Sequence, residues 1–579
     1  MKASDFIAEF LSKYSKYAFG GQGSSVIHIV DSIYKNKKIN FIPGQTEQGS
    51  SLAADAYYRT SKKMGVTIGT SGPGILNFLQ GMACSYFDSI PGIYIAGAPV
   101  VGHIRKNKKI RQIGFQEMEV QDMVRPICKY SVLVKHIEDL SYELEKCVYI
   151  ANDGRKGPTL IEIPDDISRM VMPKKIAHYK KIKFRKSKKI NIQNIKNLIK
   201  NSKKPLIVIG NGCLLSNAIP EIKKFIKKNK IPYAATWAAM HCFSTADPIN
   251  AGSFGVAATR FGNFSLQKAD LILFLGTRLS TQIVGGNLKN FAPKAKKIIV
   301  EIDKEELTNH RLPKIDLKFN CDVLDFVKNL NGQKITTNTS HLKKWKKEIV
   351  LFKKDYPILG KKNFINKKFV DPYYFFSQFY SNIEKNSIVI PDASANLIWA
   401  YQSLKTDKNP DMFTAFNHSP MGYSIAASVG AYLGSPKKKV YALIGDGSVP
   451  MNVQELETIK NYNIDVIIIV LNNQGYGLIK QTQEMWLKSK YSGTDKSSGL
   501  SLPDNRKIAS AYNIKSFSLK NNEDVKKNIK AILRLKGPVL VDVLIDPKAR
   551  VEPKIEFGKP LHDMAPYVDS LKLKQIMKD

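Results

Sequence analysis

Short apolar runs alternate with helix-like segments along most of the chain. The first third contains apolar runs at 66–70, 92–99 and 159–164, and the segments between them space their apolar residues as helices do. Strands that alternate with helices favour a parallel sheet covered by helices on both faces. We therefore predict an α/β fold that is built from doubly wound parallel sheets.

The same pattern starts again at 205–213 and at 387–394, after polar, lysine-rich stretches at 173–189 and 331–348. These polar stretches show little apolar periodicity, which favours exposed linkers. Three α/β domains of similar size are therefore expected. The predicted boundaries are 1–172 for an N-terminal domain, 190–330 for a central domain, 365–550 for a C-terminal domain, and 551–579 for a C-terminal arm.

The formal net charge of +39 on 579 residues raises the question of an anionic partner. The lysines are spread over the whole length, and no compact basic block is interleaved with aromatic residues. A solvated, lysine-rich surface is the favoured explanation. Help with binding an anionic substrate is the second alternative, and nucleic-acid binding is the least favoured.

The chain contains no run of 18 uninterrupted apolar residues, so no membrane span is expected. The first residues predict an amphipathic helix with Phe6, Phe10 and Leu11 on one side, which differs from a signal peptide. We expect a cytoplasmic protein. Its six cysteines form no CxxC pair, and this favours reduced thiols.

The most informative segment begins with an apolar run at 440–444, which leads into Gly445, Asp446, Gly447 and Ser448. Open parallel sheets place ligands at the carboxyl ends of their strands. Asp446 offers oxygen ligands to a Mg²⁺ ion, and the two glycines allow a diphosphate to approach the backbone. The N-terminus of the helix that follows favours the same anion.

A second apolar strand ends at Asn472 and Asn473, 27 residues after Asp446. This spacing leaves room for a helical crossover that returns the chain beside the first strand. The amide oxygen of Asn473 would then reach the same ion. A lone Asp-Gly is more often a simple turn, whereas the two strand ends together predict a Mg²⁺-diphosphate site.

This combination resembles the cofactor motif of the thiamine-diphosphate-dependent enzymes. In that family the aspartate, the second asparagine and a main-chain carbonyl two residues later hold the metal, which implies Asp446, Asn473 and Gly475. The segments at 392–396 and 419–431 resemble further cofactor contacts. The resemblance implies contacts to the cofactor from Ala395, Asn396, Met421, Gly445, Gly447 and Ser448, with Met421 wedged between its two rings.

The family also uses a glutamate, between a short strand and a helix, that governs protonation of the aminopyrimidine ring. Glu47 stands in that position, and Thr46 replaces the usual histidine, so any role of that histidine is in doubt. By resemblance, Phe115 and Gln116 face the donor pocket. Because Glu47 and Asp446 belong to separate domains, which the family joins between subunits, a homodimer or tetramer with shared active sites is expected.

The central domain resembles the region where acetolactate synthases hold FAD. A glycine turn between a strand and a loop contains Gly210 and Gly212. The resemblance places Arg278 against the flavin, and Asp303 and Asp322 near the adenosine. Some members keep this domain without a flavin, so both outcomes stay open, with FAD as the favoured one.

Within the family the resemblance is closest to the acetolactate synthase branch. The segments at 111–116 and 553–566 look like acetolactate-synthase-like enzymes encoded with surface-polysaccharide genes, some of which act on keto-sugars. Thr482 stands where biosynthetic acetolactate synthases have a tryptophan, and Ala98 replaces a usual glutamine. The adjacent histidine pair of pyruvate decarboxylases is absent from the sequence.

The resemblance therefore implies a thiamine-diphosphate- and Mg²⁺-dependent carboligase. It would decarboxylate pyruvate or a similar 2-oxo acid and transfer the two-carbon unit to a carbonyl acceptor. A flavin-dependent pyruvate oxidase and a sulfoacetaldehyde or acyl-CoA enzyme are alternatives within the family. A catalytically inactive regulatory or polyanion-binding paralogue is the alternative from another class.

Overall fold

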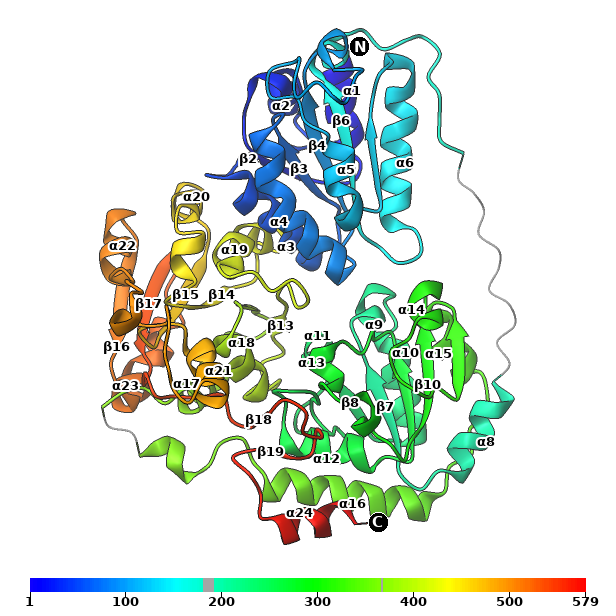
Figure 1. Cartoon of the computed structure of the whole chain (residues 1–579), viewed down its shortest axis with the longest axis vertical. Helices are drawn as coiled ribbons and strands as arrows, with labels where there is room; N and C mark the ends of the chain where they lie inside the picture. Colours follow the sequence, from blue (N-terminus) through cyan, green and yellow to red (C-terminus); the bar gives the residue numbers. More distant parts are fainter. Residues whose placement is uncertain (181–191, 366–367, 579) are drawn as a thin grey trace.

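The computed structural model describes residues 1–180, 192–365 and 368–578, so part of the predicted linker at 173–189 lies outside the described residues. Three large β-sheets flanked by helices form an N-terminal part (blue), a central part (green) and a C-terminal part (yellow to orange), as Figure 1 shows. All strand pairs within these three sheets are parallel. The predicted fold class is confirmed.

The two sheets nearer the N-terminus have six and five strands. The N-terminal order is β2 (Asn40–Pro43), β1 (Tyr17–Gly20), β3 (Gly65–Gly69), β4 (Gly92–Ala98), β6 (Pro158–Pro164) and β5 (Tyr130–Leu133), with helices α1 (Ala3–Ser12), α2 (Ile27–Lys35), α3 (Glu47–Ser61), α4 (Pro73–Asp88), α5 (Val120–Val124) and α6 (Leu140–Asn152). The central order is β11 (Leu317–Asn320), β10 (Lys296–Glu301), β9 (Leu271–Leu275), β7 (Pro205–Ile209) and β8 (Tyr233–Ala235), with helices α10 (Ile219–Asn229), α12 (Arg260–Lys268), α14 (Lys304–Thr308) and α15 (Val323–Asn331).

The C-terminal sheet has six strands and carries the metal motif. Its order is β13 (Asp411–Met412), β12 (Ile388–Pro391), β14 (Val440–Gly445), β15 (Val466–Asn472), β17 (Val539–Leu544) and β16 (Lys515–Leu519), with helices α17 (Pro372–Asn382), α18 (Ala395–Gln402), α19 (Tyr423–Gly434), α20 (Glu455–Asn461), α21 (Gly477–Trp486), α22 (Asn505–Ala511) and α23 (Asn522–Ile532). The C-terminal arm forms a short antiparallel pair, β18 (Lys554–Ile555) and β19 (Met564–Ala565), and helix α24 (Ser570–Met577).

The polar stretch at 331–348 was wrongly predicted to be only a linker. It contains most of helix α16 (Thr339–Asp355), which is long and amphipathic. Its residues Leu342, Trp345 and Ile349 are buried, and the Trp345 indole donates a hydrogen bond to Pro205 O at 3.1 Å. Their spacing of three and four residues is that of a helix face, which the surrounding lysines obscure in the sequence.

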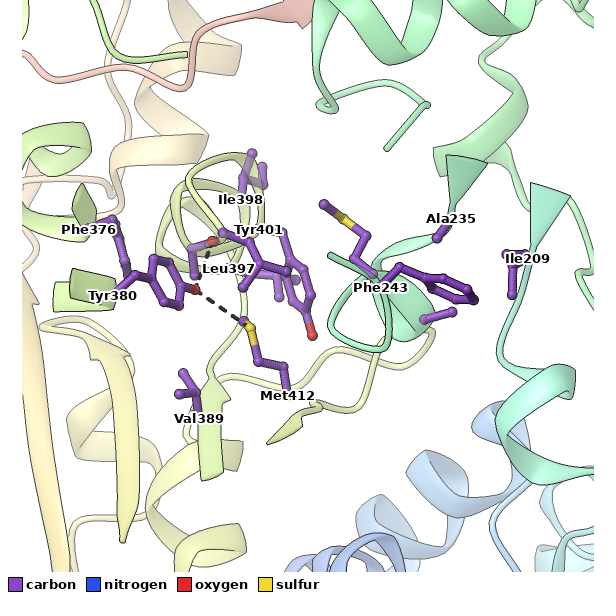
Figure 2. Packing of buried hydrophobic residues seen from close by; sticks show 14 of the residues in the cluster. Ile209, Ala235, Phe243, Phe376, Tyr380, Val389, Leu397, Ile398, Tyr401 and Met412 are labelled. Atoms are coloured by element: carbon purple, nitrogen blue, oxygen red, sulfur yellow. Dashed lines mark hydrogen bonds between the residues drawn. The ribbon is translucent and has the colours of Figure 1, made fainter. Parts of the chain in front are cut away.

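The central and C-terminal parts share one continuous apolar core. Figure 2 shows Phe243 and Ala235 of the central part in one cluster with Tyr401 of α18 and Met412 of β13, and the Phe243 ring points toward Ile209 of β7. Behind them, the Tyr380 hydroxyl donates to Ala400 O at 2.9 Å, so this buried polar group is satisfied. The edge of the C-terminal sheet is thereby fixed against the central part.

The N-terminal and C-terminal parts meet where α3 packs along α19. The backbones approach closely because both helices carry small residues here: a Cβ added to Gly430 would lie 1.8 Å from Ala53 O. At the far end of α3, Arg59 bridges Asp55 at 2.7 Å and Asp88 at 2.8 Å. The Tyr423 hydroxyl of α19 donates to Asp55 at 2.6 Å. These charged groups are almost fully buried.

No helix among the described residues has both the length and the apolar character that crossing a lipid bilayer requires.

We predict that Arg59→Ala lowers the free energy of unfolding by about 3–5 kcal/mol, because it leaves two buried carboxylates without their cation. Urea or thermal unfolding measures this loss. As a control, Arg125→Ala removes an exposed arginine that pairs with Asp122, and it should cost less than about 1 kcal/mol. Equal effects of the two substitutions would contradict the role assigned to Arg59.

Candidate active site

Asp446 lies buried directly after strand β14, with only 4% of its surface exposed. One carboxylate oxygen accepts a hydrogen bond from Gly447 N at 3.0 Å, and the other accepts one from Gly475 N at 3.1 Å. Burial raises the pKa of Asp446 to about 7, even though these backbone N–H groups act to lower it. A nearby cation would favour the ionised form.

Asn473 follows β15, the parallel neighbour of β14, and its side-chain amide can take two orientations. In one, Nδ2 donates to Gly475 O at 2.8 Å and to Asp446 Oδ1 at 3.2 Å. In the other, the amide oxygen takes that place, and three oxygens of Asp446, Asn473 and Gly475 come together. Oxygens bound octahedrally to Mg²⁺ at about 2.1 Å lie about 3 Å apart, so this arrangement fits the ion.

The glycines near this oxygen cluster differ in how much room the surrounding atoms leave for a side chain. Gly475 has φ +151°, and a Cβ there would lie 2.4 Å from Thr494 O. A Cβ at Gly447 would lie 2.3 Å from the Tyr476 ring. A Cβ at Gly445 would meet Asn396 Nδ2 only at 3.7 Å, an ordinary contact. The folded chain therefore favours glycine at 475 and 447, and has room for a Cβ at 445 in ordinary contact with Asn396.

The turn that begins helix α18 lies beside Gly445. Asn396 is buried, and its Nδ2 donates to Ala393 O at 2.7 Å, while its Oδ1 has no hydrogen-bond partner among the residues that the structure describes. The preceding Ser394 has φ +75°, which is uncommon for a residue with a side chain. An orphaned polar atom and a strained turn at this strand end fit a polar ligand. Ala395 and Ser448 are buried at the same place.

Asp392 is a residue that sequence analysis did not single out. It is fully buried at the end of β12 and accepts hydrogen bonds from Gly422 N at 3.1 Å and Ser424 N at 2.9 Å. Burial raises its pKa, and these bonds oppose that rise. Met421 precedes this hydrogen-bonded turn, so Asp392 fixes the backbone that carries it. A buried acid at a strand end was the available signal.

Glu47 is the first residue of α3 and lies at the strand ends of the N-terminal sheet. Its Oε2 accepts a hydrogen bond from Asn77 Nδ2 at 3.0 Å. Its Oε1 lies close to two glycines. A Cβ added to Gly21 would lie 2.3 Å from this oxygen, and a Cβ added to Gly74 would lie 3.2 Å from it. Glycines on both sides therefore make room for this carboxylate.

Glu455 of α20 was also missed, although it holds the segment before Glu47. It is buried and accepts hydrogen bonds from Thr46 N at 3.0 Å, Thr46 Oγ1 at 3.2 Å and Gln45 N at 3.3 Å. Burial raises its pKa, which the hydrogen bonds partly offset. The C-terminal part thus sets the position of the N-terminus of α3 within the same chain. In the described residues, no hydrogen bond connects Glu47 with Asp446.

Three sequence models of thiamine pyrophosphate enzymes match the chain in order: the N-terminal TPP binding domain over residues 1–123, the central domain over 192–330 and the C-terminal TPP binding domain over 392–543. The chain belongs to the thiamine pyrophosphate enzymes. Thiamine pyrophosphate is the thiamine diphosphate of the sequence analysis, so the resemblance found there is confirmed.

Relatives of this thiamine pyrophosphate enzyme align over nearly its whole length. It is 29% identical to the acetolactate synthase large subunit of Cyanidium caldarium, over 96% of this chain and 95% of that protein. It is 29% identical to the chloroplastic acetolactate synthase 2 of Nicotiana tabacum, over 97% of this chain and 85% of that protein. The mitochondrial acetolactate synthase of Schizosaccharomyces pombe is 28% identical, over 94% of this chain and 83% of that protein. These relatives confirm the acetolactate synthase-like branch.

A cavity of about 630 Å³ lies where the three parts of this thiamine pyrophosphate enzyme meet. Of the positions expected near FAD, Gly212, Arg278 and Asp322 line it. Gly210 is packed against Gly276 instead, and Asp303 pairs with Arg155 at 3.0 Å. The N-terminal part contributes Arg155 and Lys156 to the lining, and the C-terminal part contributes Phe416, Asn417 and His418.

Phe115 and Gln116 lie on a loop beside the Glu47 side of the site. Phe115 is 80% exposed in the single chain. Gln116 has φ +60° and accepts a hydrogen bond from Ser71 Oγ at 3.4 Å. Ser71 belongs to the turn that begins α4, the helix that also supplies Asn77. The loop and Glu47 therefore share one surface.

We predict that Gly475→Ala lowers the free energy of unfolding by about 1–3 kcal/mol, because it forces a side chain into a left-handed backbone region and against Thr494 O. Thermal unfolding of the purified protein checks this. The matched variant Gly445→Ala should leave stability within about 0.5 kcal/mol of the wild type, because its Cβ meets no close atom. A stable Gly475→Ala protein would show that the loop tolerates another backbone path.

Proposed function

We propose that this chain is a thiamine-pyrophosphate- and Mg²⁺-dependent carboligase that decarboxylates pyruvate or a similar 2-oxo acid and transfers the two-carbon unit to a carbonyl acceptor. The observation that carries the proposal is the oxygen cluster of Asp446, Asn473 and Gly475 at two adjacent strand ends. Full-length similarity to acetolactate synthases supports the type of reaction.

The bound cofactor supplies a carbon nucleophile and an electron sink. The three oxygens of the cluster would hold a Mg²⁺ ion against its diphosphate. Asn396 and Ser448 lie beside Gly445, and they would contact the same diphosphate. Met421, carried by the turn that Asp392 holds, would support the bent form of the cofactor.

Glu47 would hold and move a proton at the aminopyrimidine nitrogen. A carboxyl group suits this role, because it can both accept and donate a proton. Asn77 orients one of its oxygens, and the glycines at 21 and 74 leave the other oxygen accessible. Phe115 and Gln116 would border the donor on the same side.

A second copy of this chain would complete the site, in a homodimer or tetramer. Large apolar side chains are exposed beside both halves: Leu76, Ile113 and Phe115 near Glu47, and Met451, Ile479 and Trp486 near the metal cluster. Exposed apolar surface of this kind marks interaction sites. Pairing of the two surfaces would bring a Glu47 to the partner's metal cluster and exclude water from it.

The cavity between the three parts would take FAD, because its volume is that of an ordinary ligand site and basic and acidic groups converge on it. Arg278 and Lys156 would face the flavin or phosphates, and Asp322 the adenosine.

The cytoplasmic location expected from the sequence stays a prediction, since the named relatives include chloroplastic and mitochondrial enzymes.

The central assay uses purified protein with thiamine pyrophosphate, Mg²⁺ and labelled pyruvate, with and without 2-oxo acid, aldehyde or keto-sugar nucleotide acceptors. A carboligase releases CO₂ and forms a product that contains the acceptor. Oxygen or quinone consumption would favour a pyruvate oxidase instead. Pyruvate left unchanged would favour a sulfoacetaldehyde or acyl-CoA enzyme, or an inactive paralogue if no substrate reacts.

We expect Glu47→Gln to lower turnover roughly 100- to 10,000-fold, because an amide cannot exchange the proton. Mg²⁺-dependent cofactor binding, followed by calorimetry, should stay close to that of the wild type. Glu9→Gln, which changes an exposed glutamate of α1, serves as the control and should keep full activity. Wild-type turnover in Glu47→Gln would refute the assignment.

Co-expression of Glu47→Gln with Asp446→Ala tests whether two copies share each site. Each variant alone should be inactive. In a mixed dimer one site would combine the intact Glu47 of one copy with the intact Asp446 of the other, so about a quarter of wild-type activity should return under random pairing. No recovery, with mixed dimers verified by two affinity tags, would mean that each site belongs to a single chain.

A further inference from the structure

The loop at 105–117 is folded around one buried carboxylate. Glu117 accepts hydrogen bonds from Arg105 N at 2.8 Å, Ile113 N at 2.9 Å and Gly114 N at 3.1 Å. Burial acts to raise the pKa of Glu117, but these backbone N–H groups and the Arg105 guanidinium lower it overall. The anchored carboxylate gives the loop a fixed shape, unlike a freely solvated run of lysines.

The loop carries more cations than its acidic neighbours neutralise. The Arg105 guanidinium pairs with Glu119 at 3.0 Å, and Lys108 pairs with Glu119 and Asp122. The remaining cations, Lys106, Lys109 and Arg111, are exposed and form no ion pair with any residue that the structure describes. Three solvent-facing positive charges are therefore held on one short, shaped segment.

This segment leads directly into the Glu47 side of the site. A Cβ added to Gly72, at the start of α4, would lie 2.9 Å from Gln116 Cβ. Two residues further on, a Cβ at Gly74 would lie 3.2 Å from Glu47 Oε1. Lys106, Lys109 and Arg111 thus precede the exposed Phe115 on the same anchored loop, whose next residue, Gln116, lies against the turn beside Glu47.

We propose that the 105–111 part of this loop recognises the acceptor, beside the donor that Phe115 and Gln116 would border, and that Lys106, Lys109 and Arg111 bind a phosphate group on it. This inference rests on the proposed carboligase function and names the substrate class of the same site. Lysine and arginine bind phosphate through charge-assisted hydrogen bonds. A phosphate dianion carries two negative charges, so three cations attract it more strongly than they attract a singly charged carboxylate. The acceptor is accordingly a phosphorylated aldehyde or ketone.

The test compares two acceptors that differ by one phosphate, glyceraldehyde 3-phosphate and glyceraldehyde, with pyruvate as donor. In the wild type, kcat/KM should be about tenfold or more higher for the phosphorylated acceptor. In the triple variant Lys106→Gln, Lys109→Gln, Arg111→Gln, this ratio should fall to within about threefold of unity. Added salt should lower the wild-type ratio, because it screens exposed charges.

A matched control removes three positive charges elsewhere. Lys343→Gln, Lys346→Gln and Lys347→Gln change exposed residues of α16, and this variant should keep the wild-type ratio. A loop variant that keeps the ratio, a control variant that loses it equally, or a wild-type ratio near unity would each overturn the inference. In all three cases pyruvate-dependent CO₂ release by the wild type would still support the carboligase. Absence of that release would overturn both proposals.

Discussion

The close packing of α3 against α19 is the contact on which the rest of the structure depends. Glu455 holds the segment before α3, the Ala53 backbone touches Gly430 in the middle, and the Tyr423 hydroxyl donates to Asp55 towards the far end. One helix is therefore fixed at three points by another part of the same chain. Its first residue is Glu47, so the position of the proposed acid follows from interactions that take no part in chemistry.

Adjacent parallel strands explain the second half of the site. In the ladder between β14 and β15, Gly445 is paired with Leu471, so Asp446 and Asn473 leave the sheet side by side. The crossover between them includes α20, which carries Glu455. The same connection thus links the oxygen cluster of Asp446, Asn473 and Gly475 with the start of α3. Substitutions in this crossover affect both parts at once.

The α/β architecture and the adjacent strand ends that carry Asp446 and Asn473 could be predicted because each depends on local pattern: apolar strands, strand ends and spacing along the chain. Asp392 and Glu455 could not, because their roles depend on which backbone N–H groups the fold brings to them. Helix α16 was missed since its buried residues are sparse among lysines. Asp303 illustrates the same limit, because its partner Arg155 lies in another part of the chain.

The cavity at the junction of the three parts has a consequence for the integrity of the whole enzyme. Its walls come from segments separated by hundreds of residues, so a ligand bound there would contact all three parts and stabilise their arrangement. A ligand at 100 times its dissociation constant adds about 2.7 kcal/mol to the folded state. Cellular supply of that small molecule would therefore govern how long each copy of the protein survives degradation.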